Sequence, residues 1–200
     1  EVEKTISDIT HLITEQMNSV LTTTLSMEVE VKSQGISPFN IDEISSSFEE
    51  DLILIESHIA GKAEGKALFL LKKPDVAMVS DLMMMGEGTT DFEPEHIDAI
   101  GEAFNQVNGG LTTSLNSFYS GQFQLGQVSV NEIDTTALSS GYDDYYQVDL
   151  SFQIGDKLDS SLYLLLHSDL ILNIQDIQNI SAPPSSSPPP SPSTPSPSRS

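Results

Sequence analysis

An internal repeat constrains the fold of this chain more than any other feature of the sequence. Four residues near the N-terminus recur at an offset of 87, where Ile13, Glu15, Asn18 and Val20 match Ile100, Glu102, Asn105 and Val107. Further along, LFLLKKPDV (68–76) matches LYLLLHSDL (162–170) at an offset of 94. Offsets that differ indicate a loop insertion between matching elements. We therefore expect two similar halves, about 5–87 and 93–178.

Each half predicts the same succession of long helix, strand, hairpin and short helix. In the first half these are 5–25, 27–32, 51–60 with 66–72, and 75–85, with a loop over 33–48. In the second half they are 93–118, 122–130, 145–154 with 160–166, and 169–177, with a loop over 131–144. Neither half has enough helix to cover a sheet of its own. If the strands merge into one sheet with the long helices on one face, both apolar stripes are buried. The predicted fold is a pseudo-two-fold α/β domain over about 1–180.

The helix predicted over 93–118 has two different faces when its residues are placed at about 100° per position. One stripe is apolar and is expected to face the core: Ile97, Ile100, Phe104, Val107, Leu111, Leu115 and Phe118. A second, polar stripe lies about 150° away from the first. It consists of Asp98, Glu102, Asn105 and Gly109. A carboxylate and a carboxamide are therefore neighbours on the side that the core does not cover.

A Glu and an Asn three residues apart on an exposed helix usually have no function. Two observations favour a use here. The pair occurs twice, at matched positions of the repeat. In addition, Asn inside a helix costs a few tenths of a kcal/mol, and Gly109 and Gly110 cost about 1 kcal/mol each if they are helical.

Composition excludes several other classes of function. The net charge is −22, from 30 acidic and 8 basic residues, so nucleic acid is not an expected partner. The chain has no cysteine, which excludes disulfides and thiolate chemistry. The four histidines form no paired helical motif, so we expect no metal site. The longest apolar runs are too short or too interrupted to span a bilayer. Residues 181–200 are almost entirely Pro and Ser and are expected to form a disordered linker.

The second polar stripe resembles the phosphatase motif of the CheC/CheX/FliY family. That motif is Asp or Ser, three residues, Glu, two residues, Asn, three residues and Gly, and it is matched from Asp98 to Gly109. The preceding SDLMMMGEGTTDFEPEHI and the Pro/Ser-rich end are most similar to the middle domain of the FliY members. The resemblance implies a CheC-like duplicated fold, with one mixed sheet and two long antiparallel helices on one face.

The resemblance also implies an activity, the hydrolysis of phosphorylated CheY within the flagellar motor switch. Glu102 and Asn105 would form one catalytic pair, and Glu15 and Asn18 the other. The supporting positions are Asp98 and Gly109 in the second motif, and His11 and Thr22 in the first. His11 and Thr22 depart from the family pattern, and the Cβ of Thr22 would hinder close approach of a partner backbone.

Further implied properties are partners, metal and location. The expected partners are phosphorylated CheY and the switch proteins FliM, FliG and FliN-like proteins. The protein would need no cofactor of its own, because the response regulator supplies Mg²⁺. The expected location is cytoplasmic, at the C-ring of the flagellar basal body near the inner membrane.

The chemistry of an aspartyl phosphate fits these residue types. Its hydrolysis needs a water held in line with the leaving carboxylate. A carboxamide can hold that water by hydrogen bonding without becoming charged. The alternative is a non-enzymatic switch scaffold, because the FliM middle domain resembles the same fold without the Glu–Asn pairs. Such a scaffold would dock CheY-phosphate or other switch proteins without hydrolysis.

Overall fold

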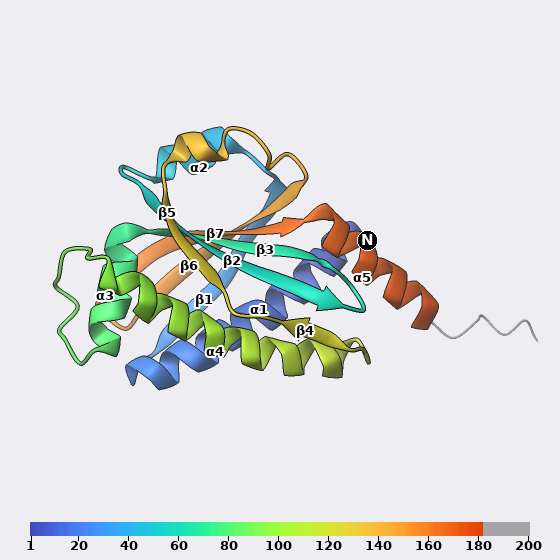
Figure 1. Ribbon diagram of the computed structural model, residues 1–200, viewed down its shortest axis with the longest axis horizontal. Coiled ribbons are helices and arrows are strands. Elements are labelled where there is room, and N and C mark those ends of the chain that lie inside the picture. The colour runs from blue at the N-terminus through green and yellow to red at the C-terminus, as the bar shows by residue number, and fades with distance from the viewer. Residues whose placement is uncertain (182–200) are drawn as a thin grey trace, which may run out of the picture.

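The computed structural model describes residues 1–181, which form a seven-stranded sheet with helices on both faces (Figure 1). In chain order the elements are α1 (Val2–Leu25), β1 (Val29–Pro38), α2 (Ile41–Ser47), β2 (Leu52–Gly61), β3 (Gly65–Lys72), α3 (Lys73–Met83), α4 (Glu95–Phe118), β4 (Phe123–Leu125), β5 (Ser129–Ile133), the 3₁₀ helix η1 (Thr135–Leu138), β6 (Tyr145–Ile154), β7 (Leu158–His167) and α5 (Ser168–Ser181). The linker predicted over 181–200 lies outside the described residues, except for Ser181 at the end of α5.

The sheet has the pseudo-two-fold symmetry that the repeat predicts. Its strand order is β1-β6-β7-β3-β2-β4, with β5 also paired to β2. Exchanging each strand for its counterpart in the other half (β1 for β4, β2 for β6, β3 for β7) reverses this order onto itself. The expected duplicated fold is therefore confirmed.

One detail of the predicted sheet was wrong. Every pairing among the described strands is antiparallel, whereas a mixed sheet was expected. The symmetry gives the reason. The matching strands β3 and β7 lie side by side at the centre, with Phe69 opposite Leu164. Because both long helices lie on the same face, the two-fold axis is perpendicular to the sheet, and such an axis between two adjacent equivalent strands requires them to run in opposite directions.

The core has a large layer on one face of the sheet and a small one on the other. Along β2, Ile53 and Ile55 join the large layer, and Leu52 and Leu54 join the small one, as strand alternation requires. Helices α1, α3, α4 and α5 cover the large layer, while α2 and η1 cover the small one (Figure 1). Within residues 1–181, no helix is both long and apolar enough to cross a membrane.

The two long helices agree with the predicted ranges to within three residues at either end. The apolar stripe of α4 is buried except near its ends, where Ile97 is half-buried and Phe118 is 53% exposed. Phe118 was expected in the core. The helix ends at this residue, and the chain turns Tyr119 inward instead, leaving that ring 5% exposed. Phe118 then packs edge-on against Tyr119, with ring centroids 4.7 Å apart.

The loop predicted over 33–48 contains regular structure instead. Strand β1 continues to Pro38, with an irregularity in its pairing between Ser33 and Gly35. Helix α2 follows, and the Oδ1 of Asn40 accepts a hydrogen bond from the backbone N–H of Glu43 at its start. An Asn followed three residues later by Glu is a helix-start signal, and the hydrophilic composition of this stretch concealed it.

The strand predicted over 122–130 is divided into β4 and β5. Between them, residues 126–128 leave the sheet and run beside α4. The loop predicted over 131–144 is shorter than expected, because β5 extends to Ile133 and η1 follows it. The departure at 126–128 matters for function, since it places backbone groups against the polar stripe of α4.

The packing at the start of β3 gives a test of the fold. A Cβ added at Gly65 would lie 2.5 Å from the Cβ of Leu170 in α5. We expect Gly65→Ala to lower the free energy of unfolding by about 1–3 kcal/mol, because α5 must shift outward. Urea denaturation followed by circular dichroism measures this change. Gly35→Ala is the control, since no atom lies within 4 Å of the added Cβ. An equal effect of the two substitutions would contradict the observed packing of α5 on the hairpin.

Candidate functional site

The two predicted sites lie on the two long helices, which run antiparallel and side by side across the sheet (Figure 1). The helices touch where Gln16 Nε2 donates to Ser114 Oγ at 3.0 Å. Gln16 is about 160° around α1 from Asn18, and Ser114 is about 180° around α4 from Asn105. The Glu–Asn pairs therefore face outward on opposite flanks of the helix pair. The structure does not bring the two sites together.

The second site is an open helix flank with one fixed carboxamide. Asp98, Glu102 and Gly109 are exposed, and Asn105 is half-buried. The Oδ1 of Asn105 accepts a hydrogen bond from the backbone N–H of Val128 at 2.8 Å. Because that N–H can only donate, it fixes which end of the carboxamide is oxygen. The Nδ2 of Asn105 has no partner among residues 1–181, so two N–H donors remain available at the surface.

The surroundings of this flank leave it accessible. Glu102 forms no ion pair with any residue in the described part of the chain. Within residues 1–181, and apart from the neighbouring backbone of α4 itself, no atom would lie within 4 Å of a Cβ at Gly109. Packing within this chain therefore does not require glycine at this position, and the helix would be more stable with another residue there.

The first site has the same Glu–Asn pair, but here both ends of the asparagine carboxamide already form hydrogen bonds within the chain. The Oδ1 of Asn18 accepts from Val31 N at 2.6 Å, and its Nδ2 donates to Val31 O at 3.2 Å. One turn later, Thr22 Oγ1 accepts from Val29 N at 3.2 Å. Both side chains thus bind the outer edge of β1. Asn18 also lines a shallow groove of about 640 Å³, together with His11 and Glu15.

Charge also differs between the two sites. The Nε2 of His11 lies 3.8 Å from a carboxylate oxygen of Glu15, with both side chains more than 60% exposed. A protonated His11 would therefore compete with any cationic partner for Glu15. The second site has Asp98 at the matched position and has no such competitor.

Sequence reasoning missed a structural use for asparagine on these helices. Asn108 and Asn116 of α4 also bind backbone groups, at Gly126 and Phe123 respectively. Asparagine at three positions of one helix was a detectable signal. The helix cost of these asparagines favours a use of some kind, and the structure shows that a structural use is part of it. Much of that cost is offset by hydrogen bonds to the neighbouring backbone.

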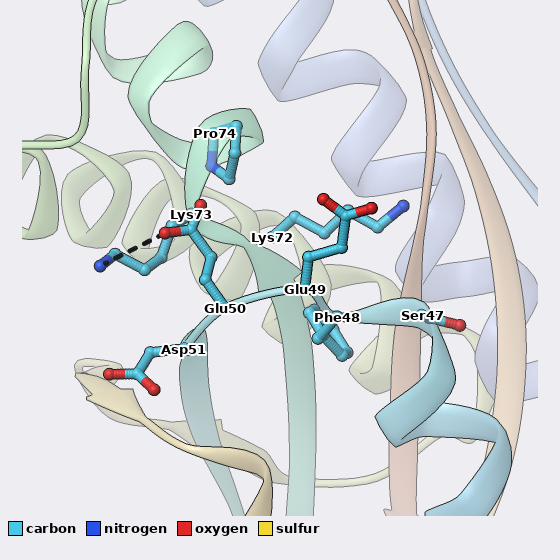
Figure 2. A pocket seen from close by; sticks show the side chains of 8 residues that line it. All are labelled: Ser47, Phe48, Glu49, Glu50, Asp51, Lys72, Lys73 and Pro74. Atoms are coloured by element: carbon cyan, nitrogen blue, oxygen red, sulfur yellow. Dashed lines mark ion pairs between the residues drawn. The ribbon is translucent and has the colours of Figure 1, made fainter.

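A further hollow lies away from both sites, between residues 47–51 and the junction of β3 and α3 (Figure 2). Its Lys73 is paired with Glu132 at 2.7 Å and lies 3.9 Å from Glu50. The hydrogen bond to Glu132 raises the pKa of Lys73 above its usual value. The positive charge of this lysine is therefore already paired with a carboxylate of the same chain. The hollow contains none of the predicted site residues. No group of three or more potential metal-ligating side chains occurs within residues 1–181.

Comparison with known proteins gives a consistent picture. No family model matches the chain. The flagellar motor switch phosphatase FliY of Bacillus subtilis strain 168 is 26% identical, with the similarity covering 80% of this chain and 46% of that protein. The chain thus corresponds to less than half the length of this curated relative.

Solved structures share the fold. FliY of Thermotoga maritima matches with a TM-score of 0.78 and 19% identity, over 91% of this chain and 98% of that one. The FliM middle domain of Vibrio alginolyticus matches with a TM-score of 0.63 and 12% identity, over 86% and 99%. A CheC-like superfamily protein from Shewanella matches with a TM-score of 0.58 and 16% identity, over 80% and 96%.

The unequal bonding of the two carboxamides predicts unequal effects on stability. Asn18→Ala removes two hydrogen bonds of about 1 kcal/mol each, partly offset by about 0.5 kcal/mol of improved helix propensity. We expect it to lower the free energy of unfolding by about 1–1.5 kcal/mol. Asn105→Ala removes one such bond, so its net effect should be about 0.5 kcal/mol. Chemical denaturation of both variants measures the difference. A larger loss for Asn105→Ala would contradict the bonding described.

Proposed function

We propose that the chain belongs to the CheC/CheX/FliY family, which its fold and its similarity to a curated FliY sequence support, and that it is a protein aspartyl-phosphate phosphatase acting on phosphorylated CheY. The observation that carries the proposal is Asn105, a carboxamide fixed through its oxygen with its Nδ2 donors directed to an open helix flank. The name of the Bacillus relative, a flagellar motor switch phosphatase, supports a phosphatase activity.

The proposal includes the setting of the reaction. We place the protein in the flagellar motor switch, with FliM, FliG and FliN-like proteins as neighbours, in the cytoplasm at the C-ring near the inner membrane. The names of the FliY relative and of the solved FliM structures, one of them a complex of FliM with FliG, support the motor switch as the setting and FliM and FliG as neighbours.

The reaction needs little covalent chemistry from this chain. An aspartyl phosphate is a mixed anhydride, so its phosphorus is already activated. A water oxygen bonds to phosphorus while the bond from phosphorus to the aspartyl carboxylate oxygen breaks, giving free carboxylate and inorganic phosphate. The protons of the water pass to phosphate and solvent. The response regulator would supply Mg²⁺ and a lysine, which neutralise charge on the phosphoryl oxygens.

Asn105 would position the attacking water. An Nδ2–H can donate to one lone pair of the water oxygen, leaving the other lone pair directed at phosphorus. Because Val128 holds the carboxamide in one orientation, little rotational freedom is lost when the water binds. Glu102, one turn earlier, would pair with the lysine of the regulator and set the docked orientation. Neither role requires a strong base, which agrees with a site that lacks histidine.

The second site is the principal one in this proposal. The carboxamide of Asn18 already binds Val31 through both of its ends. Thr22 adds a side chain where the second site has Gly109, and His11, when protonated, would compete for Glu15. The first site would therefore contribute less to turnover than the second.

A second candidate function is a non-enzymatic switch scaffold. One specific observation favours it, namely that Asn18 and Asn105 both bind the backbone of a neighbouring segment. Such bonds would be retained for stability without any catalysis. The likeness in fold to the FliM middle domain agrees with this interpretation. A scaffold would bind phosphorylated CheY without changing the rate of its dephosphorylation.

The substitution Asn105→Asp separates catalysis from folding. A carboxylate oxygen can still accept from Val128 N–H, so the fold should be kept. The substitution removes both N–H donors and places negative charge beside the phosphoryl group. We expect the acceleration of CheY-phosphate hydrolysis to fall by about 100-fold. The measurement is release of phosphate from phosphorylated CheY.

The matched control for charge is Gln106→Glu, on the neighbouring exposed position of α4. It adds the same charge about 100° away from Asn105 around the helix. Its rate should remain close to that of the unaltered protein. If Asn105→Asp turned over as fast as this control, Asn105 would have no catalytic role.

Gly109 provides a test in which stability and activity change in opposite directions. Gly109→Ala should raise the free energy of unfolding by about 0.5–1 kcal/mol, since no atom opposes the methyl group. If a partner backbone approaches this glycine closely, the same methyl group should slow CheY-phosphate hydrolysis. Ser117→Ala, at an exposed position of the same helix, is the control, with improved helix propensity and no change in rate. A Gly109→Ala protein that is more stable and equally active would refute close docking at this position.

A further inference from the structure

Asn108 lies one turn beyond Asn105, and both ends of its carboxamide form hydrogen bonds. Its side chain is 3% exposed. Its Oδ1 accepts from Ser57 Oγ of β2 at 2.9 Å, and its Nδ2 donates to the carbonyl oxygen of Gly126 at 2.9 Å. Ser57 is itself 1% exposed. The carboxamide of Asn108 therefore connects the interior of the sheet to the segment that runs beside α4.

That segment is the one that orients Asn105. Residues 126–128 lie outside the sheet, between β4 and β5. Among residues 1–181, no atom beyond its chain neighbours lies within 4 Å of where a Cβ of Gly126 would stand, so side-chain packing does not hold it. The bond from Asn108 fixes this point of the backbone. Two residues later, Val128 N–H binds the Oδ1 of Asn105.

In the first half of the molecule, the backbone beside the long helix is held in a different way. The position that matches Asn108 is Leu21, which is buried in the core and has no polar group in its side chain. There Asn18 holds the adjacent strand with both ends of its own carboxamide. In the second half, Asn108 takes over part of this task, and the Nδ2 of Asn105 has no partner among residues 1–181.

We propose that Asn108 is a positioning residue for the second site, acting through Gly126 and Val128 to keep the carboxamide of Asn105 in its working orientation. This inference rests on the proposed phosphatase function. We call the hydrogen bond from Asn108 to Gly126 the clamp. Its loss should let residues 126–128 move and leave Asn105 free to rotate. The docking surface of Asp98, Glu102 and Gly109 would remain in place. The rate of the chemical step should therefore fall while affinity for the regulator is kept.

The test replaces both buried partners together. In S57A/N108L, the second site receives the residue that the first repeat carries at Leu21, and no buried hydroxyl is left unpaired. S57A/N108A serves the same purpose without added volume. S57A alone is the control, since it keeps the bond from Asn108 to Gly126. The readouts are hydrogen exchange of the Val128 amide by NMR and steady-state kinetics with phosphorylated CheY.

We expect the double variants to exchange the Val128 amide at least about tenfold faster and to lose about tenfold in kcat, with KM unchanged. The amide of Leu70 in the central strand β3 should keep its protection. Unchanged protection of Val128 would refute the clamp. Faster exchange with an unaltered kcat would refute the positioning role, and so would a loss that appears only in KM.

The exchange readout also separates this inference from the proposed function. If the unaltered protein did not accelerate CheY-phosphate decay, the phosphatase proposal would fail. The clamp would then be decided by Val128 exchange and by the side-chain amide signals of Asn105. Those signals should shift in the double variants and stay in place in S57A. Signals that do not respond would overturn the clamp independently of any activity.

Discussion

The backbone groups at the two edges of the sheet must find hydrogen-bond partners, and the two long helices supply them. An edge strand presents unpaired N–H and C=O groups that favour aggregation unless they are covered. Thr22 and Asn18 of α1 cover β1 on one side, and Asn105, Asn108 and Asn116 of α4 bind residues 123–128 on the other. The polar flanks of the helices and the edges of the sheet therefore depend on each other.

This constraint explains why the two halves differ although their sequences match. In the first half the edge is a continuous strand, and Asn18 is committed to it through both ends of its carboxamide. In the second half the edge is broken into β4 and β5, and a second asparagine shares the work. A side chain that need not hold the backbone alone can offer its remaining donors to another molecule. In the proposed mechanism, duplication places an asparagine at the same position of both long helices, Asn18 and Asn105. Because the edge beside Asn105 is broken, its Nδ2 donors remain available for catalysis.

The sequence predicted the elements whose signals are local. The apolar stripes of the long helices, both hairpins and the recurrence of the two halves depend on spacing within short stretches. The edges were not predictable in the same way, because their bonds join residues far apart in the chain. Asn105 meets Val128 across 23 residues, and Ser57 meets Asn108 across 51. The motif identified which residues form the candidate site, but it contained no information on how far each carboxamide is already engaged. The core position predicted for Phe118 was wrong for a similar reason. Where a helix ends decides whether its last apolar residue can reach the core.

The central claim is that this chain presents a water-positioning carboxamide to a phosphorylated partner. The most direct test follows the decay of purified CheY carrying a labelled phosphoryl group, with and without this protein at substoichiometric concentration. We predict that decay accelerates in proportion to the amount of protein added, with each molecule turning over many times. Decay at the regulator's own rate, whether or not the two proteins bind each other, would contradict the claim.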